Sequence, residues 1–414
     1  MTEGLLAGLR VVECSMLGPG AISTPLADLG ADVIKVEPPT GDYIRSMSWP
    51  IIDGNSLLHL HISRGKRSIV LNLRTEAGRE TFLDLVRTAD VVVEAMRPGG
   101  LDRRGLGYGR LREINPKLVM FTISGYGMTG PYRDLPSHGI AYDAWAGTVT
   151  PEPGPDGLPS IPEHTSIGIT AGPLFGTAAI LAGVLHARET GQGCHLEVAQ
   201  SDAAAAFDWL RSEGHRAYER PESEVTGNPS DGYLRRAPGT AGMAEGVRYQ
   251  FYASTDGHIL FMASERGFWQ NFCSAVGRDD LFEAHPGERL ADHARGNLAL
   301  RHELAGIFGT RSTAEWVRFG LDHEVPIGPV NSPASIAADP QFTDRLPWQP
   351  ADRLAVEQLP FPVRAVGRRP PAAARRAPEL GEHTDEVLTE VLGYDVARRE
   401  YLRANGAFGP PKAP

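Results

Sequence analysis

A group of basic side chains follows short apolar runs in the N-terminal part of the sequence. The group comprises Arg64, Lys66, Arg67, Arg74, Arg97, Arg103 and Arg104. Guanidinium and ammonium groups form charge-assisted hydrogen bonds to phosphates. The turn Gly18-Pro-Gly20 would also let backbone N–H groups approach a phosphate, although a plain tight turn is the simpler explanation. These residues predict an anion-binding face, with an ordinary solvated surface as the alternative.

Two histidines, His138 and His164, are candidate acid–base groups because imidazole titrates near neutral pH. Three carboxylates lie near them: Asp143, Asp156 and Glu163. A lone histidine is more often structural, and each carboxylate suits a surface or capping role better than a nucleophilic one. The sequence has no Gly-x-Ser-x-Gly elbow, P-loop or His-Glu-x-x-His pair. These residues alone indicate an enzyme-like α/β protein without naming its reaction.

Short apolar runs and helical patterns alternate over the first 130 residues. The runs lie at 9–14, 32–37, 68–73, 90–95 and 118–127. This alternation predicts an α/β fold with a doubly wound parallel sheet. Such a sheet binds ligands at the carboxyl ends of its strands, where several of the basic residues lie.

The rest of the chain divides by changes in pattern. A long helix of small and apolar residues is predicted over 170–187, and a hairpin is predicted around Thr255-Asp-Gly257. We predict a large domain, a linker, a small α+β domain and a return to the large domain. Their ranges are 1–214, 215–247, 248–335 and 336–414.

Composition excludes several classes of protein. The 414 residues carry a formal charge of −10, which argues against a general nucleic-acid binder. The three cysteines lie far apart and show neither metal-ligand spacing nor a disulfide framework, which suits the cytoplasm. The N-terminus does not resemble a signal peptide, and no apolar stretch predicts a membrane span.

Several blocks of sequence resemble one known family. They include LAGLRVVECSMLGPGAISTPLADLGADVIKVEPPTGDYIR, SRGKRSIVLNLRTEAGRE, DVVVEAMRPGGLDRRGLGYGRLREINPKLV, TISGYGMTGPY, HARETGQGCHLEV and APELGEHTDEVLTEVLGYDVARREYLRANGAF. In this order they resemble the class III CoA-transferases, which include formyl-CoA transferase, carnitine CoA-transferase and α-methylacyl-CoA racemase. The resemblance covers nearly the whole chain.

The resemblance implies a fold and a ligand. The fold is a large Rossmann-like domain with an inserted small domain, and two subunits interlock like links of a chain. The ligand is coenzyme A, bound as an acyl-CoA substrate together with a carboxylic acid and no metal. The matching CoA positions are Met16, Leu71, Arg74, Ala95, Met96 and Arg103. Ala95 and Met96 replace a frequent Asn-Phe, so details of the pocket differ.

The family mechanism uses an aspartate, whose carboxylate attacks the thioester and forms a covalent intermediate. The position that matches this aspartate is Gly168, in the segment Ser166-Ile-Gly-Ile-Thr-Ala-Gly172. A second acidic position falls on Gly139, and a polar position of formyl-CoA transferase falls on Met16. Glycine cannot act as a nucleophile, so the resemblance predicts a family chain without its most reactive group.

Three functions are compatible with this substitution. In the first, the chain is the non-nucleophilic subunit of a heteromer whose paralogous partner supplies the aspartate. In the second, it is a stand-alone racemase- or epimerase-like enzyme using His138, which matches the racemase histidine. In the third, it binds acyl-CoA without catalysis. Because the CoA motifs are so complete, we favour the first.

Overall fold

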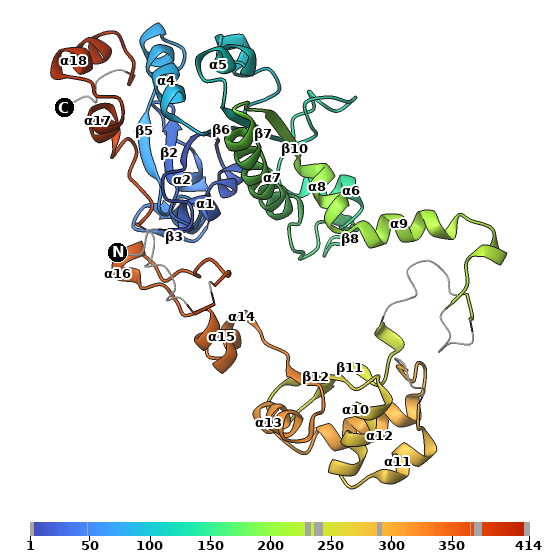
Figure 1. The fold of residues 1–414 in the computed structure, drawn as a ribbon. Helices are drawn as coiled ribbons and strands as arrows, with labels where there is room; N and C mark the ends of the chain where they lie inside the picture. Colours follow the sequence, from blue (N-terminus) through green and yellow to red (C-terminus); the bar gives the residue numbers. More distant parts are fainter. Residues whose placement is uncertain are drawn as a thin grey trace. The chain divides into compact units, whose positions relative to one another are not determined.

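The computed structural model describes residues 4–47, 49–227, 233–235, 243–287, 292–364, 366–367 and 375–409 (Figure 1). The chain folds into two units: Met1–Asp208 with Leu346–Pro414, and Trp209–Arg345. The second unit starts with helix α9 (Trp209–Tyr218), before the predicted linker. Residues 228–232 and 236–242 of that predicted linker lie outside the described residues.

The first unit is built on a six-stranded parallel sheet of order β10-β7-β6-β1-β2-β5. Its strands are β1 (Arg10–Cys14), β2 (Asp32–Glu37), β5 (Arg67–Val70), β6 (Val91–Glu94), β7 (Val119–Ser124) and β10 (His195–Ala199). The predicted doubly wound α/β fold is therefore correct, and the strand order is Rossmann-like. From β1 the chain first builds the sheet through β2 to β5, and then crosses to the other side of β1 and builds it through β6 and β7 to β10. The boundary between β1 and β6 is therefore the topological switch point.

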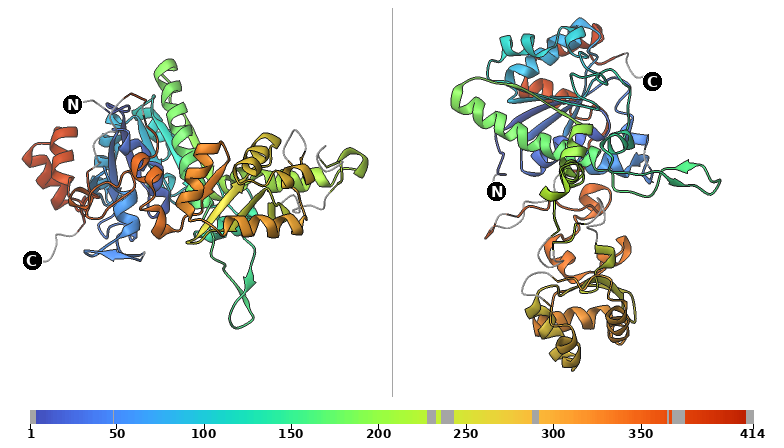
Figure 2. Two further views of the ribbon diagram at one scale, coloured as in Figure 1. Left: turned by 90° about the horizontal axis from the view of Figure 1, so that it is seen from below. Right: turned by 90° about the vertical axis from the view of Figure 1, so that its right-hand side faces the viewer.

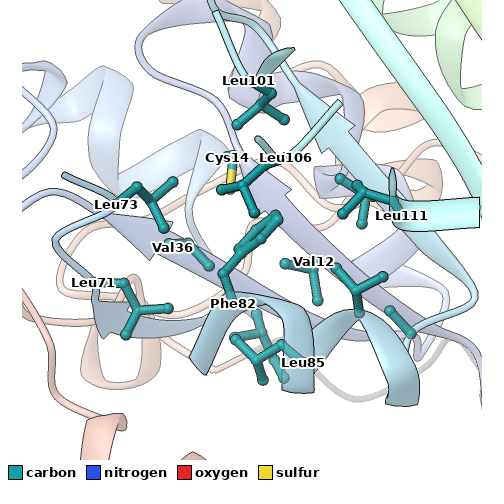
Figure 3. Close-up of a cluster of buried hydrophobic side chains, with 14 of the residues drawn as sticks. Val12, Cys14, Val36, Leu71, Leu73, Phe82, Leu85, Leu101, Leu106 and Leu111 are labelled. Carbon is teal, nitrogen blue, oxygen red and sulfur yellow. The ribbon is translucent and has the colours of Figure 1, made fainter. Parts of the chain in front are cut away.

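Alternating side chains of each strand pack on opposite faces of the sheet. Val12 of β1 packs with Phe82 of helix α4 (Glu76–Thr88), within the cluster shown in Figure 3. Val11 packs on the other face with Ile180 of helix α7 (Gly168–Thr190). Because both faces are covered, the strands read as nearly continuous apolar runs.

The other helices and turns of this unit connect or cover the strands (Figures 1 and 2). They are η1 (Gly18–Ile22), α1 (Thr24–Asp28), α2 (Ile44–Met47), α3 (Leu57–Ile62), η2 (Asp102–Arg104), α5 (Tyr108–Ile114), α6 (Ile140–Ala146), α8 (Gln200–Phe207), α16 (Ala351–Leu354), α17 (Thr384–Glu386), the π-helix Val387–Val391 and α18 (Val396–Ala404). Helices α14 (Pro333–Ile336) and α15 (Pro340–Arg345) belong to the second unit. Two small hairpins pair β3 (Ile51–Ile52) with β4 (Asn55–Ser56) and β8 (Glu152–Pro153) with β9 (Pro159–Ser160). Thr75 caps α4 as predicted, since its hydroxyl accepts a hydrogen bond from Gly78 N–H.

Helix α7 begins two residues before its predicted start and ends three residues after its predicted end. Among the described residues, it alone is long and apolar enough to cross a membrane by length and composition, and half of its most apolar window is buried. Its small residues explain the burial. Gly176 and Gly183, for example, let the helix lie against Ile22 and Val119. This helix is thus the core helix of one sheet face.

The second unit contains the predicted hairpin. Strands β11 (Tyr249–Ala253) and β12 (His258–Met262) pair antiparallel, and β13 (Ile327–Pro329) joins β12. Helices α10 (Arg266–Ala275), α11 (Asp279–Ala284), α12 (Leu298–Phe308) and α13 (Thr313–His323) complete the unit, with the short turns η3 (Glu222–Glu224) and η5 (Met243–Glu245). Its core is aromatic, with Trp269, Phe272 and Trp316 fully buried. The unit is α+β in character.

Candidate functional site

A cavity of about 520 Å³ lies at the carboxyl ends of β1, β2, β5 and β6. It is lined by Cys14, Ser15, Met16, Val36, Glu37, Pro38, Pro39, Thr40, Leu71, Asn72, Leu73, Arg74, Ala95, Met96 and Arg104. This is the switch point of the sheet, where doubly wound folds bind their ligands. The volume is within the range of small-molecule and cofactor pockets.

The cavity brings together most of the residues expected to bind CoA. Met16, Leu71, Arg74, Ala95 and Met96 all line it. Arg103 does not line it. Its side chain is exposed, and its Nη1 donates to the carbonyl of Pro98 at 3.1 Å.

Arg104 is the neighbouring arginine that does line the cavity. Its Nη1 donates to the carbonyl of Gly100 at 2.6 Å and lies 3.9 Å from the sulfur of Met96. The wall therefore places two cationic side chains, Arg74 and Arg104, beside an otherwise largely apolar surface. Such an arrangement suits a ligand that carries both phosphates and an apolar arm.

Two ionisable groups in or behind the wall stay uncharged more readily than usual. Burial raises the pKa of the Cys14 thiol, and the nearby carboxylates of Glu94 and Glu13 raise it further. Burial also raises the pKa of Glu94, whose oxygens accept hydrogen bonds from Met96 N–H at 2.8 Å and the Thr122 hydroxyl at 2.9 Å. Cys14 is thus a poor thiolate nucleophile, and Glu94 fixes the backbone at Met96.

A network of buried charges lies behind the first turn of the cavity. The Glu13 carboxylate is fully buried and pairs with Lys35 at 3.0 Å and Lys66 at 2.7 Å. Burial alone would raise the pKa of Glu13, but the two ammonium groups outweigh it and lower that pKa to about 2. Lys35 also pairs with Asp42 at 3.0 Å. These ion pairs tie β1, β2 and the loop before β5 to one another behind the cavity.

The structure leaves no room for a side chain at Gly168, the position where the sequence resemblance predicts that the nucleophile is missing. Gly168 is buried at the start of α7. A Cβ at this position would lie 2.7 Å from Cβ of Tyr142 and 3.0 Å from the carbonyl oxygen of Gln200. Carbon atoms do not approach so closely without displacement of the backbone or of Tyr142. The fold therefore has no room for a side chain here.

A neighbouring carboxylate occupies the N–H groups at the start of α7. Oδ1 of Asp143 accepts hydrogen bonds from Ile167 N–H at 2.9 Å and Gly168 N–H at 3.0 Å. The Asp143 side chain is fully buried, and its Oδ2 has no partner among the described residues. Asp143 thus satisfies donors that a helix leaves unpaired. Since it has no access to solvent, it acts as a cap and is not placed to attack a substrate.

The predicted histidine lies on an open surface. His138 is exposed in the turn before α6, and in the described part of the chain its ring has no hydrogen-bond partner. Gly139 follows with φ of 42°, a backbone conformation that disfavours residues with a side chain. Nothing in this geometry pairs His138 with a second acid–base group.

Reasoning from the sequence missed Asp42 and Glu94, and it named Arg104 among the basic residues but matched Arg103 to the CoA site. The pair Arg103-Arg104 gave a signal, but a short turn such as η2 can present either side chain. Asp42 follows the predicted strand over 32–37, and Glu94 lies near the end of the predicted strand over 90–95. Both therefore lie toward the carboxyl ends of the strands, where such sheets bind ligands.

The fold defines an α/β protein with a cavity at the switch point of its sheet. The model of CoA-transferase family III matches residues 6–384. The chain belongs to this family.

The relatives and solved structures that the chain resembles span nearly its full length. It is 32% identical over 403 residues to a succinate–glutarate CoA-transferase of Agrobacterium fabrum, covering 93% of this chain and 95% of that one. It is 29% identical to the beta subunit of a succinyl-CoA–L-malate CoA-transferase of Chloroflexus aurantiacus, with 94% of each chain covered. A CAIB/BAIF family protein from Brucella suis superposes with a TM-score of 0.73 at 28% identity, covering 94% of this chain and 100% of that one.

Proposed function

We propose that this chain binds an acyl-CoA in the cavity and serves as the non-nucleophilic subunit of a heteromeric CoA-transferase. The closed position at Gly168 carries the proposal, because a side chain there would meet Tyr142 and Gln200. Among the cavity-lining residues, the Cys14 thiol is buried with a raised pKa, and the Glu37 carboxylate is buried and pairs with Arg45 at 2.6 Å, so neither is a ready nucleophile. The aspartate would then come from a paralogous subunit.

The relatives support the assembly and suggest substrates. One of them is named as a beta subunit, so a family chain can work in a heteromer. Their names contain succinyl-CoA, succinate, glutarate and L-malate, which makes succinyl-CoA and dicarboxylic acids the first substrates to assay. Helix α7 also exposes Leu174, Phe175 and Leu185, an apolar surface that an interlocked partner would cover.

The test compares the purified chain alone with the chain co-purified with a family member that has aspartate at the position of Gly168. CoA transfer from succinyl-CoA to malate or glutarate is measured, and hydroxylamine traps any acyl-enzyme intermediate. We expect no transfer and no adduct with the single chain, because the covalent route needs a nucleophile. With the partner, we expect transfer and an adduct on the partner only.

Other outcomes separate the alternatives. Transfer by the single chain with an adduct on its own residues would contradict the proposal. CoA binding without turnover in any pairing would favour a binding protein. Exchange of the α-proton of a 2-methylacyl-CoA in heavy water, lost in His138→Ala, would favour the racemase-like function.

The two adjacent arginines give a direct test of the CoA site. Arg104→Ala is expected to weaken CoA binding about tenfold or more, because a charge-assisted hydrogen bond contributes about 1.5–3 kcal/mol. Arg103→Ala is the matched control, since this side chain is exposed outside the cavity lining. Calorimetric titration with CoA measures both. If Arg103→Ala weakens CoA binding more than Arg104→Ala does, the phosphate contact belongs to Arg103, as the family resemblance predicts.

A further inference from the structure

The turn between β1 and η1 contains a backbone outlier next to the cavity. Leu17 has φ of 61° and ψ of −148°, a region that residues other than glycine rarely adopt. It directly follows Met16, a cavity-lining residue whose side chain is 38% exposed. Such an outlier persists only where the surrounding structure holds it in place.

Asp42, in the loop between β2 and α2, holds this outlier. Its two carboxylate oxygens accept the Leu17 N–H at 3.2 and 3.1 Å, and Oδ1 also accepts Ile44 N–H at 3.0 Å. The Asp42 N–H in turn donates to Oε2 of Glu37 at 3.0 Å. Because Asp42 is only 2% exposed, little solvent competes for these bonds.

Lys35 fixes the other side of the same turn. Its Nζ pairs with Oδ2 of Asp42 at 3.0 Å and donates to the carbonyl of Ser15 at 2.9 Å. The peptide groups on both sides of Met16 are therefore tied to one buried ion pair, the carbonyl before it to Lys35 and the N–H after it to Asp42. The same pair borders residues 37–40, which form the facing wall of the cavity.

We propose that Asp42 is a positioning residue for the cavity. With Lys35 it holds Leu17 in a strained conformation and so sets Met16 in the wall that contacts bound CoA. The carboxylate acts through the turn and does not itself line the cavity. This inference rests on the proposed CoA site.

The experiment is a mutational cycle between Asp42 and Leu17, read by calorimetric titration with CoA and by thermal unfolding. Asp42→Asn is expected to weaken CoA binding about tenfold, because the strained turn relaxes once its ionic partner is lost. Leu17→Gly should keep CoA affinity within threefold of wild type, since glycine adopts this conformation without strain. Combined with Asp42→Asn, Leu17→Gly should restore affinity to within threefold.

Two control variants separate positioning from general damage. Asp28→Asn breaks a different buried pair, with Arg64 at 2.7 Å, outside the cavity lining. It should lower the unfolding temperature without changing CoA affinity. Ala355→Gly relieves another non-glycine residue with positive φ, on the surface, and should leave CoA affinity unchanged.

Leu17→Val keeps Asp42 intact and so tests the idea if Asp42→Asn folds poorly. A β-branched residue resists positive φ more strongly, and CoA affinity should fall several-fold. Unchanged affinity in Asp42→Asn or Leu17→Val, or no recovery in the double variant, would overturn the inference. If wild type does not bind CoA, the proposed function fails, and the unfolding temperatures decide the inference. In that case, a double variant whose unfolding temperature is higher than that of Asp42→Asn alone supports the positioning role of Asp42. Losses of unfolding temperature that simply add in the double variant would overturn it.

Discussion

Gly168→Asp is expected to destabilise the chain by about 3–5 kcal/mol and to restore no CoA transfer. The new Cβ would lie 2.7 Å from Cβ of Tyr142, and overpacking of this kind costs about 1–3 kcal/mol. The new carboxylate would also enter a buried site where Asp143 already occupies the N–H groups of Ile167 and Gly168. A second buried negative charge without a cation adds a larger cost.

Urea unfolding and the hydroxylamine assay measure the two parts of this prediction. Gly168→Ala isolates the steric part and should lose about 1–3 kcal/mol. Gly109→Asp is the matched control, because Gly109 lies in α5 with no atom within 4 Å of an added Cβ. It should change stability by less than about 0.5 kcal/mol. A Gly168→Asp variant as stable as wild type, with a trapped adduct on the introduced carboxylate, would show that the site is open to a nucleophile.

The sheet could be predicted from the sequence because its strands are buried on both faces. Such strands are nearly continuous apolar runs, as in residues 91–93, and their alternation with helices permits few topologies. The two short hairpins were missed because strands of two residues have no periodicity.

The candidate site could be predicted only in part. Met16, Leu71 and Arg74, which match CoA positions of the family by resemblance, line the cavity. They do so because residues that follow adjacent parallel strands meet at one edge of the sheet. The sequence shows a glycine at position 168, but it does not show that the fold leaves no room for a side chain there. That lack of room depends on Tyr142 and Gln200, which belong to other helices and touch this position only in the folded chain.

The buried charges behind the cavity give the second large effect. Glu13→Gln is expected to cost about 3–5 kcal/mol of stability, because it leaves the buried Lys66 without its carboxylate partner and leaves Lys35 paired with Asp42 alone. Glu113→Gln is the control, since Glu113 pairs with Arg110 on the surface and exposed pairs contribute about 0–1 kcal/mol. Urea unfolding at neutral pH compares the two. A loss below about 1 kcal/mol in Glu13→Gln would contradict a structural role for the network.

The same carboxylate should control stability in acid. The pKa of Glu13 is about 2 in the folded chain and near 4.5 as an ordinary glutamate, so the folded state binds its proton less readily than the unfolded state. Its contribution is therefore complete above about pH 4.5 and is lost as the pH falls toward 2. Unfolding measured across this window should show a shallower acid decline in Glu13→Gln than in wild type, because the variant has no proton to take up at this position. An equal slope in both proteins would mean that other carboxylates carry the acid sensitivity and that Glu13 is not held ionised by Lys35 and Lys66.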